Sequence, residues 1–577
     1  MNQSAKFFSC QWLVLLLVFA SGAYAQESRR TGSITGRIVV EDGSPTSGAQ
    51  VFTQQLGGSR MQPSRSQPVV DAEGNFTLNN LEARSYRVMA SLPGYVTAGE
   101  SDPNRVARLG DHVTVNLVKG GVITGRVTNQ SGEPVIAINV SVARVRDGEG
   151  KAVVGGGGRP AATDDRGIYR AYGLPAGAYL VSADSGQNSF PGSPYLGTVP
   201  VFHPSNTRDG ATEVTVLPGG EASGIDIRYR LELGHVISGK VSGALPTGNS
   251  GVSVRLATLG GQQWLASTYV QTGREQSGFE LQGVANGDYE VSAFSIDREG
   301  GGAVSQTRRV AVRNADVGGL ELALAPLASL SGKIALEPLP ALKPEEQALC
   351  VKGRSHALAE IVLRANTLAP RANSALPAGF TNSDAAPAED GSFTISLLEA
   401  GQYRLQPNLP GEAWHIKSIA PEAAPKTAKD AVKAEAKALA PNTGVIAVKS
   451  GEKLTGWLVT LAEGAAQVSG KLAGKSNGRM RAHLVPADAA LADDVLRYAE
   501  AVVRSDGTFA LTNLAPGKYW LIAKPFAADE PTDRAARPLA WDAAARAALR
   551  KAAEAGQQVV ELTACMRLSE YKLKAGN

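Results

Sequence analysis

The sequence predicts an all-β protein built from about five β-sandwich domains in tandem. Two repeated patterns carry this prediction: a short alternating strand recurs along the chain, and each copy is followed by a glycine turn that leads into an aromatic residue. The third observation is composition, because the 577 residues include Gly 64 and Pro 31 while 43% are hydrophobic. Such a mixture is typical of many short strands joined by tight turns.

The recurring strand alternates apolar and polar residues with a period of two, which predicts one inward face. Its copies are residues 34–38 (ITGRI), 123–127 (ITGRV), 237–241 (ISGKV), 330–334 (LSGKI) and 468–472 (VSGKL). A glycine occupies the central inward position of every copy, which indicates a bend or the close approach of another backbone. These glycines are Gly36, Gly125, Gly239, Gly332 and Gly470.

A turn followed by an aromatic residue forms the second signature. Its copies are 71–76, 164–169, 389–393 and 505–509. Asp and Gly favour tight hairpins in such segments. The third copy, Ser277-Gly278-Phe279, lacks the carboxylate, so we expect the acidic residue to serve the turn and not a ligand.

An apolar residue, a glycine and a tyrosine follow at fixed spacing, as L-x-x-G-x-Y. The copies are Leu174-Gly177-Tyr179, Val284-Gly287-Tyr289, Leu398-Gly401-Tyr403 and Leu514-Gly517-Tyr519, with Leu81-Arg84-Tyr86 as the first copy. The arrangement resembles the tyrosine corner of sandwich domains, so we expect each hydroxyl to bond to a nearby backbone group.

The three signatures together resemble the carboxypeptidase regulatory-like family, whose fold is a seven-stranded transthyretin-like, immunoglobulin-like or CnaB-like β-sandwich. The resemblance covers nearly all of the chain that follows the leader. The family occurs in adhesins, in transporter segments, beside peptidases and in starch-binding-like modules, so the resemblance implies a fold and leaves the function open. Some CnaB-like domains form Lys-Asn isopeptide bonds, but Lys240, Lys333 and Lys471 occupy polar strand positions that alternation points outward.

The amino terminus predicts export. Lys6 precedes an apolar run over residues 12–20, and Ala23-Tyr24-Ala25 forms a small-x-small cleavage site before Gln26. No later segment approaches about 18 uninterrupted apolar residues, so the protein is not expected to be embedded in a membrane. We expect it in the periplasm or at the cell surface.

The repeats also predict domain boundaries. We expect a signal peptide at 1–25 and sandwiches at 26–119, 120–233, 234–326, 327–466 and 467–577. The fourth sandwich carries an Ala/Lys-rich insertion near 421–441, which is expected to be exposed. The fifth carries a short helix near 538–555, with Gly556 placed as its C-cap.

Charge and cysteine content narrow the classes further. The net charge of +4 is spread along the chain without a Lys/Arg stripe, so nucleic acid is not an expected partner. Beyond the leader only Cys350 and Cys565 remain. They fall in different expected domains, so the sequence leaves their pairing open.

The motifs that carry chemistry are missing from the sequence. The six histidines are scattered, without an H-E-x-x-H pair, and no G-x-S-x-G, Cys-x-x-Cys or P-loop occurs. Calcium is the strongest metal candidate, through Asp71 with Glu73 or Asp164 with Asp165, but two carboxylates fall short of the six to eight oxygens that calcium takes. We therefore predict a non-enzymatic protein without a cofactor or metal.

Aromatic side chains outside the core signatures are the candidates for ligand binding. Trp264 with Tyr269, and separately Trp414 with His415, could each form a platform for sugar rings. The alternative is packing: Trp264 at a strand crossing and Trp414 beneath the Ala/Lys insertion.

Three functions remain open. The favoured one is a scaffold or adhesion-like protein whose loops bind a protein or polysaccharide partner. The second is a carbohydrate-binding protein. The third is an accessory subunit of a peptidase or of an outer-membrane transport system.

Overall fold

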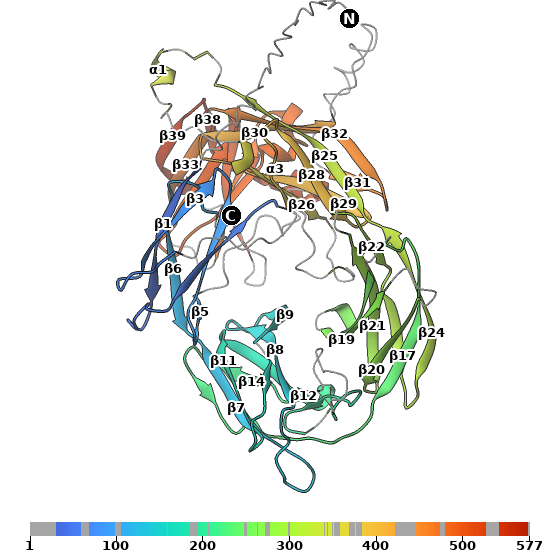
Figure 1. Cartoon of the computed structure of the whole chain (residues 1–577). Helices are drawn as coiled ribbons and strands as arrows, with labels where there is room; N and C mark the ends of the chain where they lie inside the picture. Colours follow the sequence, from blue (N-terminus) through green and yellow to red (C-terminus); the bar gives the residue numbers. More distant parts are fainter. Residues whose placement is uncertain are drawn as a thin grey trace, which may run out of the picture.

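The computed structural model describes residues 31–58, 68–98, 106–158, 160–184, 194–205, 207–246, 251–261, 264–271, 277–297, 300–339, 341–342, 344–348, 350, 358–368, 376, 384–421, 445–473, 479–526 and 542–574. The predicted signal peptide and nearly all of the Ala/Lys-rich insertion lie outside these residues. The described part is almost entirely β-strand, as the sequence predicts, and Figure 1 shows it as a series of twisted sheets.

Each recurring strand opens a new set of sheets. These opening strands are β1 (Thr31–Val40), β7 (Gly121–Thr128), β17 (His235–Gly243), β25 (Ala328–Glu337) and β33 (Ala466–Ala473). We call the segments that begin at these strands repeats 1 to 5. Every opening strand pairs antiparallel with the strand that carries the aromatic residue of the turn signature, and parallel with a strand from the end of its repeat.

The sheet orders of repeats 1 to 3 are as follows. Repeat 1 contains β3 (Asn75–Glu82)-β1-β6 (His112–Lys119)-β5 (Tyr95–Thr97) and the pair β2 (Gln50–Gln55)-β4 (Tyr86–Ser91). Repeat 2 contains two sheets. The first has the order β11 (Ile168–Leu174)-β7-β15 (Glu221–Ala222), and β16 (Ile227–Arg228) also pairs with β7. The second has the order β10 (Ala161–Ala162)-β8 (Asn139–Asp147)-β12 (Gly177–Asp184)-β13 (Val201–Phe202), with β9 (Ala152–Gly157) paired to β8 and β14 (Val214–Val216) paired to β12. Repeat 3 is one sheet, β19 (Trp264–Gln271)-β18 (Gly251–Thr258)-β21 (Gly287–Ile296)-β22 (Gly302–Ser305)-β24 (Val317–Pro326)-β17-β20 (Gly278–Val284), with β23 (Arg308–Val312) on β21.

Repeats 4 and 5 each contain two sheets. Repeat 4 contains β28 (Ser392–Leu398)-β25-β32 (Lys453–Glu463)-β30 (Trp414–Pro421) and β27 (Asp384–Ala385)-β26 (Val362–Thr367)-β29 (Gly401–Asn408)-β31 (Val445–Val448). Repeat 5 contains β36 (Thr508–Leu514)-β33-β39 (Arg567–Lys574) and β35 (Ala499–Val502)-β34 (Met480–Pro486)-β37 (Gly517–Pro525)-β38 (Val559–Leu562). Short 3-10 helices are η1 (Arg208–Gly210), η2 (Leu259–Gly261), η3 (Leu358–Glu360), η4 (Ala489–Leu491) and η5 (Val495–Arg497).

The apolar face of each opening strand lies in a hydrophobic cluster of its own repeat. Ile34 and Ile38, for example, are 0% and 1% exposed and pack with Val51 of the facing sheet. The corresponding residues of the other repeats occupy four further clusters. The predicted β-sandwich fold is therefore confirmed, while the predicted domain boundaries and strand number per domain stay predictions.

The central glycines lie where the parallel neighbouring strand comes closest. A methyl group at Gly332 would overlap the carbonyl oxygen of Trp457, and one at Gly470 would overlap that of Tyr571. The same holds for the other three copies, whose facing carbonyls are Val113, Ile225 and Leu320. The predicted close backbone approach is confirmed, and a side chain at this position is sterically excluded.

The predicted C-terminal helix is α3 (Ala543–Gly556). The Asp542 side chain caps it by accepting from the Ala545 amide at 2.6 Å, and Leu549 and Ala553 are buried against the fifth repeat. The predicted C-cap was one residue early, because Gly556 is the last helical residue and Gln557 takes the left-handed conformation, with φ 50. A second helix, α1 (Pro344–Gln347), is a single turn. Neither described helix is long and apolar enough to cross a membrane.

The repeats follow one another in a ring, and the first repeat returns to the fourth (Figure 1). The Ser85 hydroxyl, 0% exposed, donates to the Glu360 carbonyl at 2.6 Å. The Ala386 amide donates to the Gly57 carbonyl at 2.9 Å. We call these contacts between repeats 1 and 4 the closing contact. They fix two segments that are 275 residues apart in sequence.

A disulfide joins Cys350 to Cys565 across 215 residues. The two cysteines lie in repeats 4 and 5, so their assignment to different repeats does not prevent pairing. The sequence left this bond open because no pattern of spacing identifies a bridge between repeats. The bond fastens the fifth repeat covalently to the fourth.

Candidate binding surface

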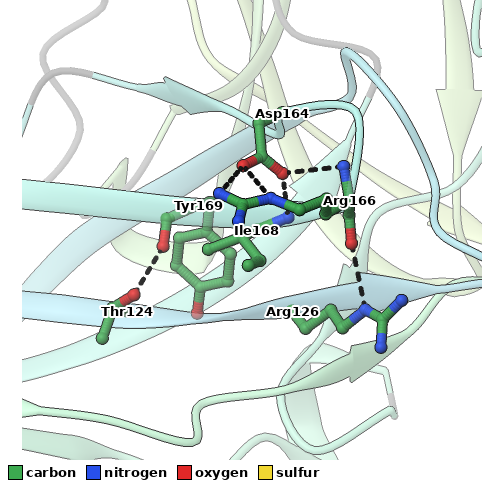
Figure 2. A network of polar contacts seen from close by, with 6 residues as sticks. All are labelled: Thr124, Arg126, Asp164, Arg166, Ile168 and Tyr169. Atoms are coloured by element: carbon green, nitrogen blue, oxygen red, sulfur yellow. Dashed lines mark hydrogen bonds and ion pairs between the residues drawn. The ribbon is translucent and has the colours of Figure 1, made fainter.

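The Asp-Gly turns use their carboxylates to hold the hairpin. In repeat 2, Asp164 accepts from the Ile168 amide at 2.7 Å and from the Arg166 amide at 3.0 Å (Figure 2). The Arg166 guanidinium also forms an ion pair with this carboxylate at 2.9 Å. The hydrogen bond from the Ile168 backbone N–H, together with the Arg166 contacts, lowers the pKa of Asp164 below its ordinary value.

The neighbouring strands complete the network around this turn. Thr124 donates to the Tyr169 carbonyl at 2.8 Å, and Arg126 donates to the Arg166 carbonyl at 3.0 Å (Figure 2). Both donors belong to the opening strand β7. The turn is therefore tied to the strand with which its hairpin pairs.

The other turns repeat this chemistry. Asp71, Asp390 and Asp506 accept from the amides of residues 75, 392 and 508 at 2.7, 2.9 and 2.9 Å. Side-chain hydrogen bonds from the same residues are the main reason that the pKa of each carboxyl is lowered. Among the residues that the structure describes, no group of three His, Cys, Asp or Glu side chains is placed to hold a metal ion. Asp71 and Asp164 thus serve backbone donors.

All five tyrosine corners form as predicted. Each hydroxyl donates to the carbonyl four residues earlier, at 2.9, 2.6, 2.9, 2.8 and 2.9 Å for Tyr86, Tyr179, Tyr289, Tyr403 and Tyr519. Burial raises the pKa of Tyr86 and of Tyr179 to about 12. Arg84 in place of the usual glycine does not prevent the first corner. These tyrosines are structural.

Trp414 and His415 lie at the junction of repeats 4 and 5, not on an open surface. The half-buried Trp414 packs against the core of repeat 4, and its carbonyl accepts from the side-chain amide of Asn513 at 2.7 Å. His415 is 7% exposed. Burial, together with the positive Arg497 and Lys417, lowers the pKa of His415 to about 4. The geometry favours packing for this pair.

Trp264 and Tyr269 lie on the same face of β19 because the strand contains a bulge. Tyr269 pairs with Ser253 and Trp264 with Ala257, and the register shifts between these pairs. Ser253 and Ala257 are four residues apart on β18 and therefore point to the same side. The opposite face carries Val254, 0% exposed, into the core. Both aromatic side chains consequently point away from the core.

Each of these two rings rests on a specific support. The Arg255 guanidinium lies over the Trp264 ring and also near the Phe294 ring, 5.2 Å from its centroid. Arg255 is 5% exposed, and burial lowers its pKa to about 9, so it is charged at neutral pH. The far end of the Tyr269 ring lies over Gly251, where a methyl group would overlap it. Trp264 is nevertheless 46% exposed and Tyr269 59%.

A groove of about 1150 Å³ runs beside this face, between repeats 2 and 3. Trp264 and Ser267 of β19 line it together with Asp184, Arg208 and Glu280. A second cavity of about 490 Å³ lies among residues of repeats 1, 4 and 5 and contains the buried His483, 3.5 Å from Glu500.

The sequence analysis paired Trp264 with Tyr269 as one candidate platform, although a spacing of five residues puts two side chains on opposite faces of a regular strand. The bulge in β19 is what brings the two rings to one face. Arg255 and Gly251 were missed. The available signal for Arg255 was a charged residue inside the apolar stretch 252–257. Lys240, Lys333 and Lys471 are exposed, as predicted.

Comparison with known proteins agrees with the resemblance found in the sequence. Residues 33–118 match the family model described as carboxypeptidase regulatory-like domain. This range contains the recurring strand, the turn and the tyrosine corner of repeat 1. No protein of curated function matches the chain.

Several solved structures with a similar fold are bacterial pilins. They include a minor pilin of Streptococcus agalactiae, 14% identical, covering 34% of this chain and 97% of that one with a TM-score of 0.18. The Bacillus anthracis TIE protein is 10% identical, covering 76% and 70% with a TM-score of 0.14. A shaft pilin of Lactobacillus rhamnosus GG is 11% identical, covering 35% and 99% with a TM-score of 0.17.

Proposed function

We propose that this protein is an exported, non-catalytic scaffold whose interlocked β-sandwich repeats present a binding surface to a protein or polysaccharide partner in the periplasm or at the cell surface. The observation that carries the proposal is the interlocking itself. The closing contact joins repeats 1 and 4, and a disulfide joins repeats 4 and 5. A frame held in this way keeps distant loops at fixed positions, which is what a scaffold requires.

The junction of repeats 4 and 5 supports the same reading. The side-chain amide of Asn513 donates to the Gly411 and Trp414 carbonyls at 2.8 and 2.7 Å. Arg497 donates to the Lys417 carbonyl at 2.6 Å. These bonds are specific and directional, so the two repeats have one defined orientation.

Small-angle X-ray scattering of the mature protein tests the frame. The ring predicts one compact particle, and Ser85→Trp, which places a large side chain in the buried closing contact, should increase the radius of gyration. Ser47→Trp, at an exposed loop position of the same repeat, is the matched control and should leave the curve unchanged. A wild-type curve typical of flexibly linked beads would refute the rigid scaffold.

Export is tested separately on the precursor. Fractionation and amino-terminal sequencing should find the protein outside the cytoplasm with Gln26 as its first residue. Retention of the full leader on a cytoplasmic product would contradict export.

A further inference from the structure

We infer that one face of β18 and β19, the face that carries Trp264 and Tyr269 and points away from the core, binds an oligosaccharide or polysaccharide segment. The two rings serve as stacking platforms. The inference rests on the proposed function and names the partner class of the scaffold. Its starting point is the bulge, since a regular strand would send one of the two rings toward the core.

Both rings are held so that one side is supported and the other is open. Arg255 supports Trp264, and Gly251 leaves room for Tyr269 to lie over the strand. Flat, supported aromatic rings present the broad apolar surface on which the apolar face of a sugar stacks. Because the rings are already oriented, binding loses less side-chain conformational entropy than it would with mobile rings.

The spacing of the two platforms defines the size of the ligand. Their partners Ser253 and Ala257 are four residues apart, which corresponds to roughly 14 Å along the strand. A single sugar ring is too short to reach both platforms. The ligand class is therefore a chain of sugars, which contacts Trp264 and Tyr269 at separate residues of the chain.

The groups beside the platforms suit hydroxyl-rich ligands. Ser267 is exposed and Ser253 is half-buried, and both belong to the face that carries the rings. Each serine hydroxyl can donate one hydrogen bond and accept others, as sugar hydroxyls require. Trp264 and Ser267 also line the groove between repeats 2 and 3, so a long chain can continue into it.

The size of the apolar area favours a glycan over a protein. On the described residues of β18, β19 and β21, Trp264 and Tyr269 are the only large apolar side chains that are exposed. A stable protein interface buries about 800 Å² on each partner around an apolar centre. Two rings flanked by serines, with Leu196 and Leu259 each 46% exposed in the adjoining groove, offer less than this.

The experiment is a polysaccharide array, followed by calorimetry, on the full mature protein. Cellohexaose, maltohexaose and chitohexaose serve as the soluble probes for glycans that score on the array. Tyr269→Ala and Trp264→Ala should each weaken binding about tenfold or more, since each removes one stacking partner. Tyr172→Ala removes a tyrosine that is 62% exposed on β11 of repeat 2 and should change nothing.

Gly251→Ala provides a second variant that removes no ligand contact. The added methyl group displaces the Tyr269 ring, so binding should weaken although both aromatic residues are present. This variant also answers the objection that Trp264→Ala acts by uncovering Arg255. Circular dichroism and the scattering curve show whether each variant keeps the fold.

Two results would overturn the inference. One is no binding of any glycan; if a purified protein then binds in a Tyr269-dependent way, the face is assigned to a protein partner. The other is glycan binding that is the same in Tyr269→Ala and Trp264→Ala as in the wild type. In either case an unchanged scattering curve leaves the scaffold proposal intact, so the two failures are distinguishable.

Discussion

Acid should weaken the fourth repeat through one buried histidine. His415 is 7% exposed, and among the described residues its Nδ1 has no hydrogen-bond partner. Its pKa falls from 6.5 to about 4 because burial disfavours the charged ring and Arg497 and Lys417 add positive charge, which Glu337 offsets in part. The folded protein therefore binds a proton at His415 less readily than the unfolded chain does.

The sign and the size of the effect follow from this difference. Stability is complete above pH 6.5, where the ring is neutral in both states, and is lost as the pH falls toward 4, where only the unfolded chain has taken up the proton. The loss in the free energy of unfolding is about 2 kcal/mol at pH 5 and about 3 kcal/mol below pH 4.

Urea unfolding at pH 7 and pH 5, followed by tryptophan fluorescence, measures this loss. His415→Leu keeps the volume and removes the titration, so the variant should lose about 2 kcal/mol less than the wild type between the two pH values. His112→Gln, at an exposed position on β6, is the control and should behave as the wild type. Equal pH dependence in the wild type and His415→Leu would refute the assignment.

Three further predictions concern the frame. Tyr179→Phe removes the 2.6 Å hydrogen bond of the corner and should cost about 1 kcal/mol, because the partly buried Pro175 carbonyl loses its donor. Thermal unfolding measures this cost, and no change in the melting temperature would contradict a stabilising corner. Gly332→Ala forces a methyl group against the Trp457 carbonyl and should unfold repeat 4 or separate β25 from β32; native-like hydrogen-exchange protection of β32 would argue against the steric reason. Cys350→Ala removes the disulfide and should lower the free energy of unfolding by about 2 to 5 kcal/mol. Thermal unfolding of the variant, and of the wild type with and without reductant, measures this loss; the same melting temperature in all three samples would show that the bond adds no stability.

Much of the fold could be predicted because it is written in local patterns. Alternation predicts that Ile34 and Ile38 lie on the inward face of their strand. Gly36 indicates the close approach of a neighbouring backbone, and Tyr86 indicates a tyrosine corner. All of these features depend on residues within a few positions of one another, or on a backbone constraint that a single glycine reveals. The family resemblance follows from the same patterns.

The candidate binding surface could be predicted only in part, since it depends on register. Trp264 and Tyr269 share a face because one extra residue enters β19, and no sequence pattern marks that bulge. The support under each ring comes from β18, whose pairing with β19 is a tertiary fact. For the same reason, the Cys350–Cys565 bond and the closing contact were beyond reach of the sequence: both join segments more than 200 residues apart.

The closing contact also constrains the order in which the protein can mature. Repeat 1 is synthesised long before residue 360. The surface around Ser85 is therefore exposed to solvent until the fourth repeat has been synthesised and folded. Lengthening the loop to 275 residues adds little entropic cost, because closure costs grow only with the logarithm of loop length, about 0.6 kcal/mol for each doubling. The closing contact can therefore form only late in synthesis, but the long loop adds little to its entropic cost. Repeat 1 therefore cannot acquire its full set of native contacts until Glu360 and Ala386 have been added to the chain.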